Sequence, residues 1–276
     1  MSLLMTRAAI LAQGGAGLAP PVENGSAWEL DVTRSPAGYT LADGNQSAVN
    51  TSGGSNYTRW VPSAKPVQPA DGRRYWEVHC ADGGAAIFDG YMGVISEAMR
   101  PHHDTGWNPI SGGSIGWRGN GTLWSCNAAP SASSTQRLSG LPSHGAGDVL
   151  MFVLDPAAAS LWIGKNGVWH SDPAGPPTWS AAPSPAFYPV IQGRNPGDGG
   201  RLRSLPSQFS YPVPPGILPL GFDEPDLRFF AAQVFLDLTR DDAAGIALVE
   251  AWREHGTGAG TLTAAQAHLY IETEIS

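Results

Sequence analysis

Charged residues are scarce in this chain. Only 14% of its 276 residues are Asp, Glu, Lys or Arg, and 24 acidic against 16 basic residues give a net charge of -8. The basic residues form no run. Proteins that bind nucleic acid or anionic membranes present a basic surface. The composition therefore argues against nucleic acid and against membrane surfaces as partners.

Cysteine and long apolar runs are also scarce. Cys80 and Cys126 are the two cysteines, and both lie in predicted strands. Two are too few for a disulfide framework, so we expect buried thiols. No apolar run approaches the about 20 residues that cross a bilayer as a helix. The apolar stretch Ala8–Ala12 is too short for a secretory signal, and residues 1–23 are predicted to form an extended arm.

Sequence motifs of catalysis and cofactor binding are missing as well. No Gly-x-Ser-x-Gly elbow occurs. Gly14–Gly17 follows no predicted strand, which excludes a dinucleotide-binding loop, and Lys165 lies in a turn rather than in a phosphate-binding loop. We therefore predict no cofactor.

Two groups of residues are candidates for chemistry. His102, His103 and Asp104 are adjacent in a predicted loop, and neighbouring histidines rarely point at one metal ion. Asp148 and Asp155 flank a predicted strand at positions of opposite parity, which places them on opposite faces. Turn-initiating roles fit both aspartates better than a glycosidase pair. We predict no metal site, no catalytic residues and no enzymatic activity.

Turn-forming residues and tryptophan are abundant, with 35 Gly, 24 Pro and ten Trp. Apolar residues make up 42% of the chain, which is ample for a packed core. Short β-rich segments recur at roughly ten-residue spacing with turn signals between them. This pattern is typical of an antiparallel β-sandwich.

The most informative stretch is 147–169, which is predicted to form a hairpin. The apolar run Val149–Leu154 ends at a turn that begins with Asp155 and Pro156, and Leu161–Ile163 resumes the strand. Gly164–Gly167 is the next turn, where Asn and Gly adopt positive φ at low cost. Further strands are predicted at Trp28–Val32, Tyr39–Leu41, Arg73–Cys80, Tyr91–Ile95, Ser114–Arg118, Thr122–Cys126 and Phe187–Ile191. Loops are predicted at 81–90, 100–113, 127–143, 173–185 and 193–200.

Four of these segments, in this order, resemble the SPRY family. They are Arg74–Val78 (RYWEV) with the following strand Gly90–Ile95, Ser114–Gly121 (SIGWRGNG), the hairpin from Gly147-Asp148 to the KNG turn at Gly167, and Phe187–Val190 (FYPV). The resemblance implies a bent, concanavalin-like sandwich of two antiparallel sheets spanning residues 24–219. It also implies a binding module whose specificity comes from loops at one sandwich end, without general catalytic residues. Two local departures are Trp162-Ile-Gly, in place of the usual aromatic before KNG, and Pro156 within the hairpin.

The composition changes after Pro219. Leu227–Leu238 is a β-leaning apolar run, Asp242–His255 has apolar residues at helical spacing, and Thr261–Ile275 alternates again. Residues 220–276 are thus predicted to form a β-α-β unit. A unit of this size cannot hold a core alone, so we expect it to serve in attachment or oligomerisation.

Aromatic and polar residues in the predicted loops are the candidate ligand contacts. Flat rings cover apolar faces of sugars or peptides, while amide and guanidinium groups supply directed hydrogen bonds. The candidates are Tyr57, Trp60, His102, His103, Asp104, Trp107, Asn108, Trp179 and Arg194. Core packing remains the alternative role for each of these rings. Strand tryptophans are predicted to be core residues: Trp28, Trp76, Trp117, Trp124 and Trp162.

The absence of charge runs and the leftover arm and tail also resemble phage structural proteins that display SPRY-like domains. The leading functional hypothesis is therefore a non-catalytic binding module displayed on a phage or phage-like virion, as a head or tail spike, fibre or decoration subunit. Its partners would be other virion proteins, copies of itself, and a host surface glycan or protein. One alternative is an intracellular adaptor that binds a peptide through the same loops. The other is a glycan-active sandwich enzyme, which needs two convergent carboxylates.

Overall fold

A computed structural model describes residues 26–52, 59–103, 112–126 and 135–222. These residues belong to one compact unit, Glu23–Phe222. The predicted arm at 1–23 and all but the first three residues of the predicted unit at 220–276 lie outside the described residues.

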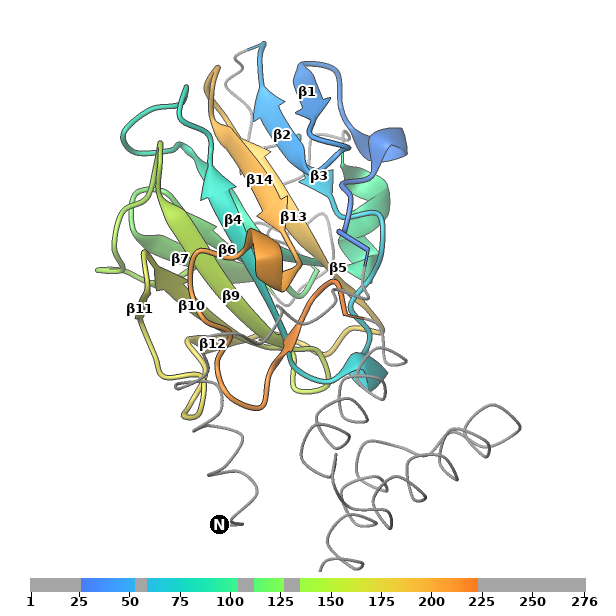
Figure 1. Ribbon diagram of the computed structural model, residues 1–276, viewed down its shortest axis with the longest axis vertical. Helices are drawn as coiled ribbons and strands as arrows, with labels where there is room; N and C mark the ends of the chain where they lie inside the picture. The colour runs from blue at the N-terminus through green and yellow to red at the C-terminus, as the bar shows by residue number, and fades with distance from the viewer. Residues whose placement is uncertain (1–25, 53–58, 104–111, 127–134, 223–276) are drawn as a thin grey trace, which may run out of the picture. The chain divides into compact units, whose positions relative to one another are not determined.

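The described residues form two β-sheets packed as a sandwich, as predicted (Figure 1). The first sheet has the order β1-β2-β14-β4-β9-β10-β11, with β12 beside β10 and β15 beside β4. Its strands are β1 (Tyr39–Ala42), β2 (Ser47–Asn50), β4 (Arg74–Cys80), β9 (Val149–Asp155), β10 (Ser160–Lys165), β11 (Val168–Trp169), β12 (Trp179–Ser180), β14 (Gly199–Arg203) and β15 (Leu218–Pro219). All its pairs are antiparallel except the short parallel pair of β15 with β4.

The second sheet is antiparallel throughout, with the order β3-β13-β5-β6-β7-β8. Its strands are β3 (Val61–Pro62), β5 (Gly90–Ser96), β6 (Ser114–Arg118), β7 (Thr122–Cys126), β8 (Thr135–Leu138) and β13 (Phe187–Gly193). The described residues also contain four short 3₁₀ helices: η1 (Val32–Arg34), which precedes β1, and η2 (Pro69–Asp71), η3 (Glu97–His102) and η4 (Pro206–Gln208), which lie between strands. None of the described helices is long and apolar enough to cross a membrane.

Alternation along the strands divides the buried residues between the core and the outer faces. In β4, Trp76 and Val78 belong to the main core between the sheets, whereas Tyr75 belongs to a separate cluster on the outer face of the first sheet. The Trp76 and Phe152 rings stack with centroids 5.2 Å apart. Adjacent strand residues point to opposite faces, so one strand serves two clusters.

Residues 206–219, called the strap here, cover the outer face of the first sheet. Phe209 of the strap meets the Tyr75 ring edge-on, with centroids 4.8 Å apart. The Tyr211 ring lies over Gly167, where an added Cβ would be 2.8 Å from the ring. On the second sheet, η3 and Trp60 cover the outer face in a cluster with Tyr188 and Val190.

The predicted central hairpin is confirmed. β9 and β10 pair antiparallel, and the turn after Lys165 places Asn166 and Gly167 at φ 50° and 84°. The Asp148 carboxylate clamps this turn, accepting bonds from Lys165 Nζ at 2.9 Å and from Asn166 Nδ2 at 2.8 Å. Burial would raise the pKa of Asp148, but these bonds and one from Gly145 N–H together lower it. The Asp and KNG residues of the motif thus have a structural role.

Four sequence predictions of strands and loops were wrong. The predicted loop at 173–185 contains the short strand β12, which pairs with β10. Trp28–Val32 is not a strand: only Leu30 forms a bridge, to Ser63, and Asp31 then caps η1 by accepting from Thr33 N–H. The predicted loop at 127–143 contains β8, whose residues are mostly exposed. The predicted loop at 193–200 ends in β14, which starts with Gly199, where an added Cβ would lie 2.1 Å from the Ala48 carbonyl oxygen. A glycine that lets two strands approach closely looks in the sequence like a turn residue, which is why this strand was predicted as a loop.

The predicted core tryptophans divide into two groups. Trp28, Trp76, Trp117 and Trp162 are buried as predicted, although Trp28 precedes the strands. Trp124 is only half-buried, because its neighbour Leu123 takes the core-facing position of β7. Cys80 is a buried thiol, and burial raises its pKa; the side chain of Cys126 is not described.

Candidate functional site

Several connections meet at one end of the sandwich, called the loop end here. They comprise residues 81–89, 119–121, 139–148 and 194–198. Strand pairing brings them together, because Gly193 pairs with Gly90 and Gly200 pairs with Cys80. Main-chain bonds such as Phe88 N–H to the His144 carbonyl, 2.9 Å, then join one loop to the next.

A buried carboxylate fixes two of these loops. The Asp198 side chain is 0% exposed and accepts hydrogen bonds from the backbone N–H groups of Ala85 at 3.4 Å, Asp89 at 3.2 Å and Asn195 at 3.1 Å. A buried charge is stabilised when such donors surround it. Asp198 therefore ties the β4–β5 loop to the β13–β14 loop.

Tyr39 and Asn50 fix the start of the β13–β14 loop from the neighbouring strands. The Tyr39 hydroxyl donates to the Gly193 carbonyl at 2.7 Å and accepts from Gly193 N–H at 2.9 Å. Asn50 Nδ2 donates to the carbonyls of Gly193 and Arg194, at 3.0 and 2.9 Å. Burial raises the pKa of Tyr39, which keeps the hydroxyl protonated as a donor. Arg194 thus starts from a rigid backbone.

Above this support lies an ion-pair cluster of Asp89, Arg118 and Arg194. Asp89 Oδ1 accepts from Arg118 Nη2 at 2.7 Å, and Asp89 Oδ2 accepts from Arg194 Nη1 at 2.6 Å. The three side chains are 24–30% exposed. Ile87, two residues before Asp89, is 53% exposed. Two oriented guanidinium groups next to an exposed aliphatic side chain can contact both polar and apolar parts of a ligand.

His144 packs beneath the loop end between two aromatic rings. Its ring meets Trp117 at 5.0 Å and Phe88 at 6.3 Å, both edge-on, and its Nε2 lies 3.2 Å from the Trp117 carbonyl oxygen. The side chain is 1% exposed. Burial lowers the pKa of His144 to about 4, so the ring is neutral at pH 7 and its Nε2–H donates to Trp117.

We expect this histidine to make the fold acid-sensitive. Its folded pKa is depressed, so the associated stability is fully present above the ordinary value of 6.5 and is lost as the pH falls toward 4. Between pH 7 and pH 5, the free energy of unfolding should fall by about 2 kcal/mol through this group. Urea unfolding at both pH values should show a smaller fall for His144→Phe. The exposed His170, as His170→Gln, is the control, and equal falls in all three proteins would contradict the expectation.

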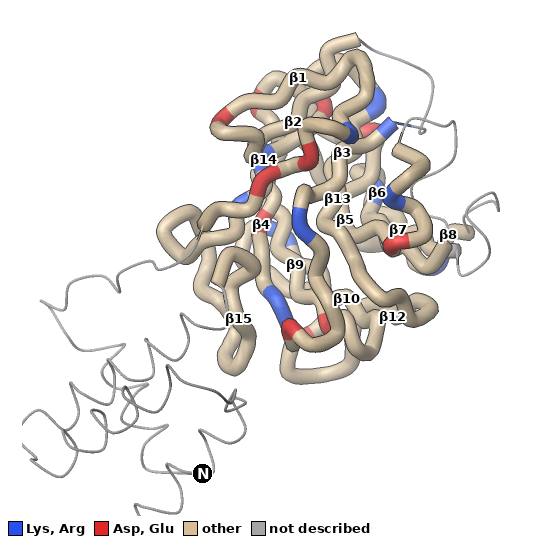
Figure 2. Tube along the Cα trace, turned by 90° about the vertical axis from the view of Figure 1, so that its right-hand side faces the viewer, with Lys and Arg blue, Asp and Glu red and all other residues tan. Residues whose placement is uncertain are grey.

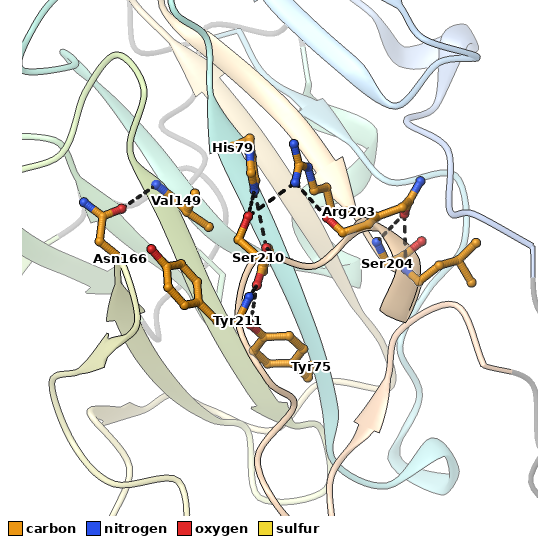
Figure 3. Close-up of polar contacts among 11 residues, drawn as sticks. Tyr75, His79, Val149, Asn166, Arg203, Ser204, Ser210 and Tyr211 are labelled. Atoms are coloured by element: carbon orange, nitrogen blue, oxygen red, sulfur yellow. Dashed lines mark hydrogen bonds and ion pairs between the residues drawn. The ribbon is translucent and has the colours of Figure 1, made fainter. Parts of the chain in front are cut away.

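One serine, histidine and carboxylate contact one another on the outer face of the first sheet (Figure 3). Ser210 Oγ lies 3.2 Å from His79 Nε2, and Glu77 Oε2 lies 3.4 Å from the same nitrogen. A catalytic triad uses the two ring nitrogens separately, one for the nucleophile and one for the carboxylate. A single Nε2 cannot donate to Glu77 and accept from Ser210 at once. This arrangement does not activate the serine.

Asp148 and Asp155 do not converge as a glycosidase pair would. They lie at opposite ends of β9, and each caps a turn, by accepting from Gly145 N–H and from Ala158 N–H. At the loop end, Asp198 is fully buried and accepts from the Asp89 N–H group. No cluster of three or more potential metal ligands occurs among the described residues.

The structure separates the sequence-predicted ligand contacts. Arg194 belongs to the ion-pair cluster. Trp179 lies in β12 near the opposite end, where it pairs with Leu161 and the Arg137 guanidinium lies 5.6 Å from its ring centroid. Its ring is half-buried against the core.

Trp60 corrects the expectation of an exposed loop ring. Its side chain is 0% exposed, because it fills the outer face of the second sheet beside Met99 of η3. Its backbone N–H donates to the carbonyl of His103, 3.4 Å away. His102 ends η3, His103 follows it, and both are half-buried. Tyr57, Asp104, Trp107 and Asn108 lie outside the described residues.

Sequence reasoning missed Asp89, Arg118 and Asp198. Arg118 was placed correctly in its strand, but nothing local shows that it faces Asp89, 29 residues earlier. Asp198 follows Pro196-Gly197, which indicates a turn and gives no sign of full burial. The spacing of charged residues alone could not have identified the cluster.

Comparisons with known proteins give structural likeness only. No family model matches the sequence, and no curated protein matches it. Among solved structures, the chain is similar to the SPRY domain of human HERC1, with 18% identity and a TM-score of 0.43 over 63% of this chain and 95% of that one. The PSpry domain of TRIM65 has the same identity and TM-score, and the match covers 73% of this chain and 96% of that one. Stonustoxin has 18% identity and a TM-score of 0.40, and the match covers 64% of this chain and 27% of that one.

Proposed function

We propose that this chain is a non-catalytic recognition module whose ligand contacts the loop end. The observation that carries the proposal is the partly exposed ion-pair cluster of Asp89, Arg118 and Arg194, held by main-chain hydrogen bonds to Asp198, Asn50 and Tyr39. Donors that are fixed before a ligand arrives cost less entropy on binding. Guanidinium groups suit directed recognition of ligand oxygens.

The hydrogen-bond partners of the polar groups support a non-catalytic role. His79 offers one nitrogen to both Ser210 and Glu77. Asp148 and Asp155 act in turns at the two ends of β9. Each group has a structural partner that accounts for its position.

We further propose that the module is displayed on a virion-type assembly, as a spike, fibre or decoration subunit, where it recognises a host surface glycan or protein. Residues 1–23 and 223–276 would attach it to other virion proteins or to copies of itself. The support is the sequence alone, which predicts an extended arm at 1–23 and, at 220–276, a unit too small to hold a core alone.

Recognition at the loop end can be tested by binding. The full chain is screened on an array of host-type glycans and against a displayed peptide library, and the selected ligand is titrated into Arg194→Ala and Arg118→Ala. We expect affinity to fall at least about tenfold in each, since hydrogen bonds from charged groups are lost. Arg137→Gln, which removes an arginine whose guanidinium lies 5.6 Å from the Trp179 ring centroid and outside the ion-pair cluster, should bind normally. Unchanged affinity in both loop-end variants would place the ligand elsewhere.

Attachment through the terminal segments can be tested by measuring the mass, and so the number of subunits, of the assembled protein. Native mass spectrometry compares the full chain with residues 23–222. The shorter chain keeps Leu220, which is buried, and the Phe222 carbonyl that accepts from Arg74 Nη1 at 2.7 Å. An oligomer that becomes monomeric on truncation is expected, and a monomeric full chain would contradict self-assembly.

A further inference from the structure

Two arginines of β14 lack a close carboxylate partner. Arg201 and Arg203 are two residues apart, so both face the same side of the strand. Arg201 Nη1 lies 3.9 Å from Asp43, and Arg203 forms no ion pair with any described residue. In contrast, Arg118 and Arg194 each contact Asp89 within 2.7 Å.

The carboxylate opposite Arg203 forms its hydrogen bonds with other groups. Glu77 is the cross-strand partner of Arg203. Its oxygens instead accept from the Tyr75 hydroxyl at 2.7 Å and from the Ser210 and Tyr211 N–H groups at 2.8 and 2.9 Å. Arg203 Nη1 donates to a neutral group, the Gln208 carbonyl, at 2.7 Å. Burial lowers the pKa of Arg203; Glu77 opposes this and Arg201 adds to it.

Donor groups from three segments surround these arginines. His79 pairs with Arg201 across the strands. Ser210 of the strap is exposed, and its Oγ lies 3.2 Å from His79 Nε2 and 3.5 Å from Arg203 Nη1. Figure 3 shows His79, Ser210 and Arg203 directed toward one another. Arg201 Nε is buried and has no hydrogen-bond partner.

We propose that Arg201, Arg203, His79 and Ser210 form an oxyanion site, which we call the β14 anion site. It binds a sulfate or phosphate monoester group. The guanidinium, imidazole and hydroxyl donors come from β14, β4 and the strap, and such a spread suits a tetrahedral anion better than a planar carboxylate. The bound anion accepts from both guanidinium groups, neither of which has a carboxylate of the described residues in direct hydrogen-bond contact, and supplies a partner for Arg201 Nε. The site lies on the outer face of the first sheet, so it does not depend on recognition at the loop end.

The test is a titration of the full chain with sodium sulfate and with sodium phosphate at constant ionic strength, the balance being sodium chloride. NMR signals of the arginine Nε–H groups report binding. We expect the Arg201 signal to shift and saturate. Arg203→Gln and Arg201→Gln should each raise the dissociation constant about tenfold or more, while Arg137→Gln should match the wild type.

The wild-type titration keeps the test valid if a variant is poorly folded. A shift that does not saturate, or that chloride reproduces, overturns the proposal, and so does wild-type affinity in both β14 variants. Glucose 6-sulfate and O-phosphoserine then present the group on two different carriers. Tighter binding of one identifies the source of the anion. Binding of the free ions but of neither ester overturns the assignment to a monoester.

Discussion

Replacement of Asp198 by alanine should lower the free energy of unfolding by about 3–5 kcal/mol. The carboxylate is fully buried and accepts the N–H groups of Ala85, Asp89 and Asn195. Its removal leaves buried donors unsatisfied in two loops at once. Because the same loops carry Asp89 and Arg194, we expect ligand binding at the loop end to be lost together with stability.

Thermal and urea unfolding measure this effect. Asp82→Ala is the matched control, since Asp82 is an exposed aspartate of the same β4–β5 loop. Its substitution should change stability by less than about 0.5 kcal/mol. For Asp198→Asn, which keeps one acceptor oxygen, the loss of stability should lie between those of Asp198→Ala and Asp82→Ala. A melting temperature for Asp198→Ala close to that of Asp82→Ala would show that the carboxylate does not hold the loops.

Replacement of Glu77 by glutamine should lower the free energy of unfolding by about 3 kcal/mol at pH 7. The carboxylate is 0% exposed and accepts from Tyr75, Ser210 and Tyr211, which fastens the strap to β4. An amide can accept at only one of its two ends. We expect the backbone amides of Ser210 and Tyr211 to exchange hydrogen faster in the variant.

The pH dependence gives a second readout for Glu77. Burial would raise its pKa, but bonds from His79, Ser210, Tyr75 and Tyr211 together lower it below the ordinary value of 4.5. The stability it contributes is therefore present above pH 4.5 and is lost as the pH falls through the folded pKa. The difference between wild type and Glu77→Gln should narrow in acid. Glu29→Gln, at an exposed glutamate, is the control; a difference that stays constant with pH would contradict the assignment.

The charge distribution of the unit limits where recognition can occur. Figure 2 shows charged residues scattered singly along a mostly uncharged trace. Several described arginines contact a carboxylate directly, as in Arg73–Asp155 at 3.3 Å and Arg100–Asp31 at 3.0 Å. The two proposed sites use different arginines: Arg118 and Arg194, which contact Asp89 at the loop end, and Arg201 and Arg203 in the β14 anion site. The two proposals can therefore be tested with separate sets of variants.

Sequence patterns suffice to predict the β-sandwich and its central hairpin. Both depend on local chemistry, namely alternation in β4 and β9, positive φ at Asn166 and Gly167, and turn capping by Asp148 and Asp155. Strands without such signals were missed: β8 is mostly exposed, and β14 begins with two glycines.

The candidate sites depend on contacts between residues far apart in the sequence. Asp89, Arg118 and Arg194 meet because three antiparallel strands end at the same edge, and the residues are 29 and 105 positions apart for the two ion pairs. Trp60 looks like a loop aromatic in sequence, yet η3 and β13 enclose it. Cross-strand register places Arg203 opposite Glu77, but the Ser210 N–H group of the strap donates a hydrogen bond to that carboxylate. Long-range pairing leaves no local trace in composition or spacing, which is why these contacts could not be predicted.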